Sequence, residues 1–110
     1  MLILEGILHT HLRQFAIAAS PREAVGLILS DLSVVRLPNY ASAPEHQFKV
    51  AKNDILNALG DEENLDEVVF WHSHPMGGLG PSRLDMKHKT LFNHHLVLSV
   101  VENDIVPSWY

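Results

Sequence analysis

The sequence of 110 residues contains no cysteine. Without thiol groups the protein can form no disulfide bonds, no thiolate metal site and no catalytic thiolate. Any metal ion that it binds must therefore be held by nitrogen and oxygen atoms.

Basic residues and long apolar runs are also scarce. The chain has eight Lys and Arg residues and thirteen Asp and Glu residues, which gives a formal charge of -5. Because this net charge does not attract phosphate groups, nucleic acid is not an expected partner. The longest apolar runs, such as residues 96–101, are far shorter than the roughly 18 residues of a membrane span. No signal peptide is recognised at the N-terminus. We therefore expect no membrane partner and a cytoplasmic location, the host cytoplasm if the protein is phage-encoded.

The composition that remains is that of one folded domain over residues 1–110. Hydrophobic residues make up 46% of the chain and charged residues 19%, which suits a single small core. Apolar periodicity and turn residues predict helices over residues 4–19, 54–59 (capped by Asn53) and 82–92. They predict strands over residues 24–30, 34–37, 46–50, 67–73, 95–101 and 105–110. The expected fold is a mixed α/β (α+β) structure of three layers, with a central mixed sheet flanked by about three helices.

One segment carries most of the chemistry: His72-Ser73-His74-Pro75, followed after six residues by Ser82 and after two more by Asp85. Neighbouring side chains of a strand alternate between its faces, so His72 and His74 project from the same side, about 6 to 7 Å apart at the backbone. The glycine-rich loop that follows could bring Asp85 to both rings. Two imidazoles and a carboxylate fill three positions of a tetrahedral zinc site and leave one for water, which is typical of catalytic zinc.

Each half of this pattern also has a plainer interpretation. Eight histidines in a chain of this length make close pairs frequent by chance. Ser82 and Asp85 fit a helix capping box. The capping role does not exclude metal binding, because the positive end of a helix keeps a carboxylate in its first turn ionised.

The whole pattern resembles the JAMM/MPN+ metalloprotease family. Its signature, a distant Glu and then HSHP or HTHP, six residues, Ser, two residues and Asp, is matched without a gap by residues 72–85. Residues 21–28 resemble the segment around the family's catalytic Glu, which points to Glu23. Read without the family, Glu23 is a solvated turn residue, and Gly26 either allows a close backbone approach or is simply a strand glycine. The chain looks most like the compact bacterial, archaeal and phage members, including the N-terminal domain of tail assembly proteins similar to the lambda tail protein K.

The resemblance implies a cytidine-deaminase-like fold and a role for each residue. His72, His74 and Asp85 would bind Zn²⁺, whose water ligand has its pKa lowered toward about 7. Glu23 would act as the general base, and Ser82 would stabilise the oxyanion. The implied activity is that of a zinc metallopeptidase or isopeptidase. Its substrate would be an extended peptide or protein, including a ubiquitin-like protein or a phage tail protein.

Two other functions remain open from the sequence. A phage tail assembly module could keep the fold, and even the metal, with little or no catalysis. A role on DNA like that of RadC proteins is disfavoured by Ser73, where their motif has Asn, and by the acidic composition.

Overall fold

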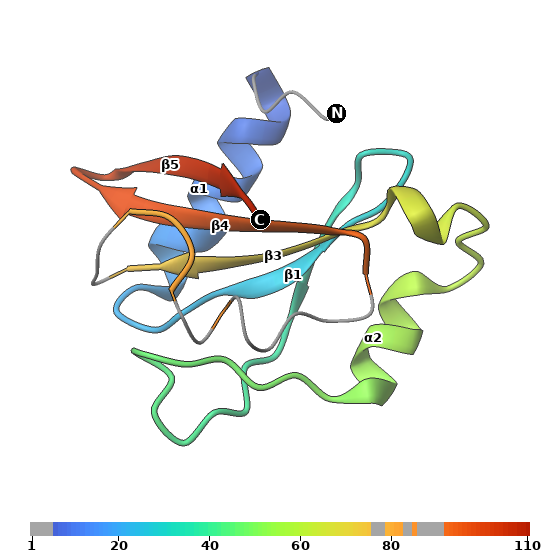
Figure 1. The fold of residues 1–110 in the computed structure, drawn as a ribbon, viewed down its shortest axis with the longest axis horizontal. Helices are drawn as coiled ribbons and strands as arrows, with labels where there is room; N and C mark the ends of the chain where they lie inside the picture. Colours follow the sequence, from blue (N-terminus) through green and yellow to red (C-terminus); the bar gives the residue numbers. More distant parts are fainter. Residues whose placement is uncertain (1–5, 76–78, 83–84, 86–91) are drawn as a thin grey trace.

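The computed structural model describes residues 6–75, 79–82, 85 and 92–110. Its elements, in chain order, are α1 (Gly6–Ala19), β1 (Val25–Ile28), β2 (Val34–Leu37), α2 (Lys52–Leu59), the 3-10 turn η1 (Leu65–Glu67), β3 (Val69–His74), β4 (His94–Val101) and β5 (Asp104–Trp109) (Figure 1). The predicted mixed α/β fold is confirmed. Among the described helices, none is long and apolar enough to cross a membrane.

The five strands form one mixed sheet in the order β2-β1-β3-β4-β5. β3 and β4 run parallel, and the other neighbours run antiparallel. The C-terminal ends of β3 and β4 therefore lie at the same edge of the sheet, on the left in Figure 1. His74 is the last residue of β3, so the HSHP segment lies where the chain leaves the sheet at that end.

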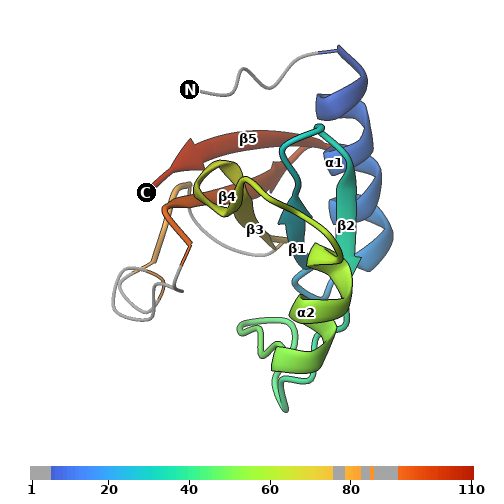
Figure 2. The ribbon, with the colours of Figure 1, turned by 90° about the vertical axis from the view of Figure 1, so that its right-hand side faces the viewer.

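The sheet is covered on both faces. On one face, apolar residues of α1 pack against Trp71, Leu96 and Leu98. On the other, residues of α2 and of the segment after β2 pack against Leu27 and Phe70. Figure 2 shows α1 along one side of the sheet and α2 close to β2. This double coverage explains why every residue of β3 except His74 is buried.

Two predicted details are wrong. Asn53 does not cap α2: the helix begins at Lys52, after Ala51, which makes no capping side-chain hydrogen bond. Residues 46–50 do not form a strand. The side chains do alternate as in a strand, because Phe48 and Val50 pack inward while Gln47 and Lys49 are exposed. The backbone, however, forms its hydrogen bonds with Asn39 and Tyr40 and not with a strand.

The predicted helix over residues 82–92 lies outside the described residues, apart from Ser82, Asp85 and Phe92. The helix over residues 4–19 and both hairpins are confirmed, with ends shifted by a few residues. Such shifts are usual at the frayed ends of elements.

Candidate metal centre

The two histidines of β3 point toward a common position. As the alternation of a strand requires, both rings lie on the same face, and their Nε2 atoms are 3.2 Å apart. The His72 side chain is fully buried and that of His74 is 13% exposed. The pair is thus enclosed by protein on the His72 side and reachable on the His74 side.

Asp85 lies against both rings, with a different carboxylate oxygen nearest to each Nε2 atom. Its Oδ1 lies 3.2 Å from His72 Nε2, and its Oδ2 lies 3.0 Å from His74 Nε2. The carboxylate also accepts a hydrogen bond from the Ser82 backbone N–H at 2.8 Å, while the Asp85 N–H donates to Ser82 Oγ at 3.0 Å. The capping box is therefore formed, and it aims Asp85 at the histidines.

The spacing of these donor atoms fits zinc. Ligand atoms 2.0 to 2.1 Å from a tetrahedral ion lie about 3.3 Å from one another. The two ring nitrogens are 3.2 Å apart, and each lies 3.2 or 3.0 Å from a different oxygen of the Asp85 carboxylate. Two imidazole nitrogens and a carboxylate oxygen are also a donor set that suits this ion.

Glu23 lies beside the two rings and is buried, with 5% of its surface exposed. A carboxylate oxygen of Glu23 and a ring nitrogen from each of His72 and His74 all lie within 4.8 Å of one another. The solvated position expected for Glu23 without the family is wrong. Its backbone is held on both sides: the N–H donates to Pro44 O at 2.7 Å, and its carbonyl accepts from Asn39 Nδ2 at 3.0 Å.

Ser73 fixes the distance between the Glu23 segment and β3. Its side chain projects away from the two rings, as predicted, and its Oγ accepts a hydrogen bond from Ala24 N–H at 2.8 Å. The Ser73 N–H donates to Ala24 O at 2.9 Å. These two buried bonds attach the residue after Glu23 to the residue between the histidines.

Burial and neighbouring charges shift the pKa values of the site residues in different directions. Burial raises the pKa of Glu23 to about 7, against the smaller lowering effect of His74. Burial lowers the pKa of His72, whereas the hydrogen bond to Asp85 raises the pKa of His74. Burial also opposes ionisation of Asp85, but the bonds from both histidines and from the Ser82 backbone outweigh it and hold the Asp85 pKa well below 3.8. A neutral His72 and an ionised Asp85 are the forms that a metal ion requires.

Two aromatic residues that the sequence did not single out lie against His72. The ring of Phe48 is 4.7 Å from the His72 ring between centroids, and Tyr110 Oη lies 3.4 Å from His72 Nδ1. Phe48 and Val50 alternate with polar residues in the predicted strand over residues 46–50, which was the available signal that Phe48 points inward. No local pattern connects Tyr110 to a residue 38 positions away.

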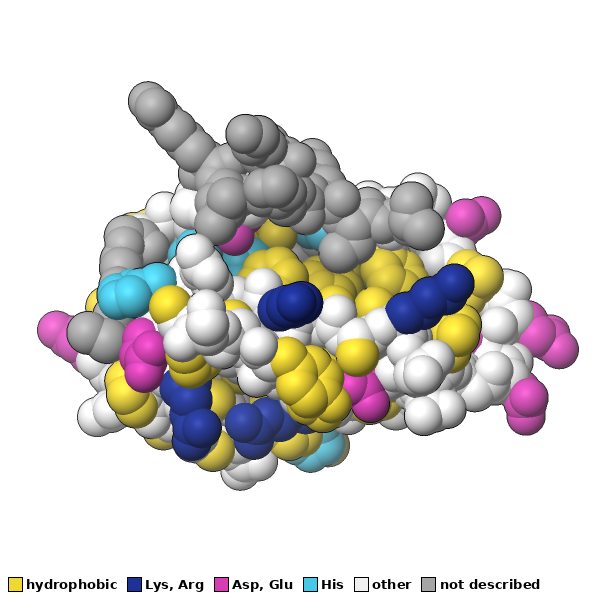
Figure 3. All heavy atoms as spheres, turned by 90° about the horizontal axis from the view of Figure 1, so that it is seen from below, with side chains coloured by type: hydrophobic (Ala, Val, Ile, Leu, Met, Phe, Trp, Pro, Cys, Tyr) yellow, Lys and Arg dark blue, Asp and Glu magenta, His cyan; other side chains and the backbone are white. Residues whose placement is uncertain are grey.

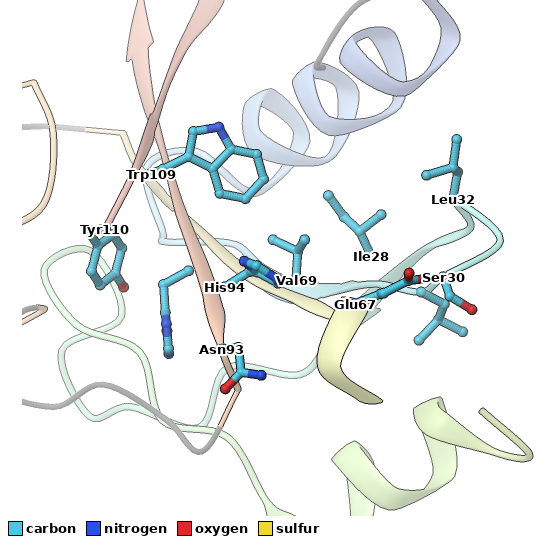
Figure 4. A pocket seen from close by; sticks show the side chains of 11 residues that line it. Ile28, Ser30, Leu32, Glu67, Val69, Asn93, His94, Trp109 and Tyr110 are labelled. Carbon is cyan, nitrogen blue, oxygen red and sulfur yellow. The ribbon is translucent and has the colours of Figure 1, made fainter. Parts of the chain in front are cut away.

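A pocket of about 670 Å³ lies toward the other end of β3, among Ile28, Val69, Glu67 and Trp109, and Tyr110 also lines it (Figure 4). The four residues Glu23, His72, His74 and Asp85 do not line it.

On the face drawn in Figure 3, His and acidic side chains lie next to one another, and basic side chains are interspersed with apolar, acidic and neutral ones.

Comparison with known proteins agrees with this architecture. The family model described as prokaryotic homologs of the JAB domain matches residues 6–110. The solution structure of protein DSY2949 from Desulfitobacterium hafniense is similar to this chain, with a TM-score of 0.67 and 23% sequence identity, and the match covers 91% of this chain and 76% of that chain. Because the sequence identity is only 23%, this similarity shows that the two proteins share a fold and shows nothing about a shared function. No curated protein matches the chain.

Proposed function

The chain belongs to the prokaryotic homologs of the JAB domain, a compact JAMM/MPN-type domain, and we propose that it is a zinc-dependent metallopeptidase or isopeptidase. The observation that carries the proposal is the meeting of His72, His74 and Asp85 at 3.0 to 3.2 Å, with a buried Glu23 beside them. Burying two carboxylates and two imidazoles together costs folding free energy unless each group is hydrogen-bonded or paired. A domain that served only as a scaffold would have no use for such a cluster.

Of the two carboxylates near the rings, Asp85 is the proposed metal ligand and Glu23 is not. One Asp85 oxygen lies 3.2 Å from His72 Nε2 and the other lies 3.0 Å from His74 Nε2, each close to the separation of two neighbouring ligands on one ion. A Glu23 oxygen and the two ring nitrogens lie within 4.8 Å of one another, but Glu23 forms no ion pair with either ring among the described residues, whereas Asp85 forms one with each. This leaves the Glu23 carboxylate free to exchange a proton.

A zinc ion held by His72, His74 and Asp85 would act as a Lewis acid on the scissile carbonyl and would lower the pKa of a water molecule, which makes that water a nucleophile near neutral pH. Glu23 takes the proton from the attacking water and delivers it to the departing amine, a task that suits a carboxyl group whose pKa is about 7. Ser82 uses its oxygen to accept the Asp85 N–H. Its hydroxyl hydrogen can then be donated to the oxyanion of the tetrahedral intermediate.

The proposed substrate is an extended peptide or protein segment, with a ubiquitin-like protein or a phage tail protein as the expected kinds, in the cytoplasm. Such a segment binds by adding to an open strand edge. β5 is one edge strand, and its N–H groups alternate between β4 and the open edge. Because Tyr110 N–H donates to His95 O of β4, the backbone nitrogen of Pro107, three residues earlier, lies on the open edge. Proline offers no donor there, so we place the substrate away from the outer edge of β5.

The test compares Glu23→Gln with Glu63→Gln, an exposed residue of the loop after α2. Cleavage of peptide and isopeptide libraries is measured together with the zinc content of each protein. Glu23→Gln should lose about 10² to 10⁴-fold in kcat/KM, the usual contribution of a general base, while zinc stays bound. Glu63→Gln should match the wild type, and a chelator should abolish cleavage.

Cleavage that persists in Glu23→Gln would remove Glu23 from the mechanism. A wild-type protein that holds zinc, cleaves nothing and associates stably with a tail or other partner protein would favour the assembly function over the enzyme.

A further inference from the structure

We propose that Tyr110 is a positioning residue for the metal centre: its hydroxyl accepts the Nδ1–H of His72 and so keeps Nε2 of that ring free to bind the ion. This inference rests on the proposed function, because it concerns how the zinc ligand is prepared. It adds a residue that lies outside the matched motif of residues 72–85.

The chemistry of His72 requires such a partner. Its Nε2 is the atom that faces His74 Nε2 and Asp85 Oδ1. A neutral imidazole that binds metal through Nε2 carries its hydrogen on Nδ1, and that hydrogen must be accepted by another group. The His72 ring is fully buried, so water cannot serve, and an unpaired N–H would cost stability and favour the wrong tautomer.

Tyr110 supplies the acceptor. Its Oη lies 3.4 Å from His72 Nδ1, at the long end of hydrogen-bond distances, and its ring stands edge-on to the His72 ring at 87° with centroids 6.0 Å apart. The backbone of Gly80 acts on the second histidine, because it contributes to raising the pKa of His74. Gly80 is in turn attached to β4 by its N–H bond to Ser99 Oγ at 3.1 Å.

The register of the sheet explains why Tyr110 reaches this position. Trp109 pairs with Leu96, and the next residue continues the ladder through Tyr110 N–H to His95 O at 3.0 Å. Side chains alternate along a strand, so Trp109 packs with the α1 cluster and Tyr110 turns to the opposite face, where His72 lies. The Tyr110 ring also packs on His95, with centroids 5.3 Å apart.

The experiment replaces Tyr110 by Phe in the full chain, which removes the oxygen and keeps the ring. Tyr40→Phe is the matched control, because Tyr40 donates its hydroxyl to Asp54 at the surface, 2.9 Å away. Zn²⁺ affinity is measured on metal-stripped protein by competition with a chromophoric chelator, and the visible spectrum of the Co²⁺-loaded protein is recorded. Tyr110→Phe should weaken Zn²⁺ binding about 10 to 100-fold, the usual effect of losing such a partner, and should change the Co²⁺ spectrum. Tyr40→Phe should do neither.

A second measurement separates positioning from general damage to the fold. In a His72→Ala background, Tyr110→Phe should weaken the residual Zn²⁺ binding no further, whereas a global structural defect would weaken it in both backgrounds. Equal Zn²⁺ affinity and equal Co²⁺ spectra in wild type and Tyr110→Phe would overturn the inference and leave the proposed function intact. A wild-type protein that binds no Zn²⁺ at all would overturn both.

Discussion

Gly26 lies in β1 where two neighbours occupy the space of a side chain. A Cβ atom at this position would collide with the carbonyl oxygen of Val35 and would lie 2.6 Å from an atom of the Trp71 ring. The backbone of β2 cannot yield as a flexible side chain could. We therefore predict that Gly26→Ala lowers the free energy of unfolding by about 3 kcal/mol, the upper part of the range for overpacked cores, as measured by urea denaturation.

The control for this prediction is Gly60→Ala. Gly60 has a φ of +52°, a ψ of -120° and no heavy atom within 4 Å of an added Cβ, so backbone strain alone opposes alanine there, at a cost of about 1 to 3 kcal/mol. A Gly26→Ala protein as stable as wild type would contradict the role of close approach at Gly26.

Individual site residues differ in how far the sequence could identify them. His72, His74, Ser82 and Asp85 lie within 14 consecutive residues, and strand alternation and helix capping are short-range rules that place them together. Glu23 was chosen from the resemblance alone, because its burial depends on contacts with Pro44 and Asn39. Tyr110 was missed, since its approach to His72 depends on the pairing of β4 with β5.

At the scale of elements, Glu62 connects the segment after α2 to the end of β1. Its two carboxylate oxygens accept hydrogen bonds from the N–H of Ser30 at 2.7 Å and from the Ser30 hydroxyl at 2.8 Å. These bonds, with a further one from Asn64 N–H, lower the pKa of Glu62 below its ordinary value of 4.5.

A folded-state pKa below the unfolded one gives stability that is present above pH 4.5 and is lost as the pH falls through the folded value. We therefore predict that wild type is more stable than Glu62→Gln at neutral pH and that this advantage shrinks progressively below pH 4.5. Urea unfolding of both proteins across this range measures the difference.

Glu63→Gln provides the comparison, because Glu63 is exposed in the same loop. Its difference from wild type should stay small at every pH. An advantage of wild type over Glu62→Gln that is independent of pH would show that the ionised carboxylate is not what joins these elements.

Elements with a strong local signal were predicted well, and those that depend on partners were not. β3 combines aromatic and β-branched residues between turn signals, and the structure shows it as a buried central strand. Residues 46–50 alternate between apolar and polar side chains, as a strand does. Their backbone, however, forms hydrogen bonds with the Asn39 side chain: its Oδ1 accepts from Lys49 N–H, and its Nδ2 donates to Gln47 O. A single asparagine thus replaces a partner strand, which no periodicity can reveal.

For the whole molecule, the proposed centre unites segments from almost the full length of the chain. Glu23 follows α1, the histidines end β3, Asp85 follows the glycine-rich loop, and Tyr110 follows β5. The sheet order β2-β1-β3-β4-β5 brings them together, because β3 lies between β1 and β4. The layers could be predicted from the sequence, but this strand order follows from no local rule applied to it.

Calorimetric titration of the metal-stripped full chain with Zn²⁺ tests the central claim most directly. The account predicts one ion per chain in wild type and in His11→Ala, whose side chain is exposed on α1. We predict that binding is strongly weakened in His74→Ala and in Asp85→Asn. Absence of binding in wild type, or undiminished binding in both site variants, would contradict the proposed metal centre.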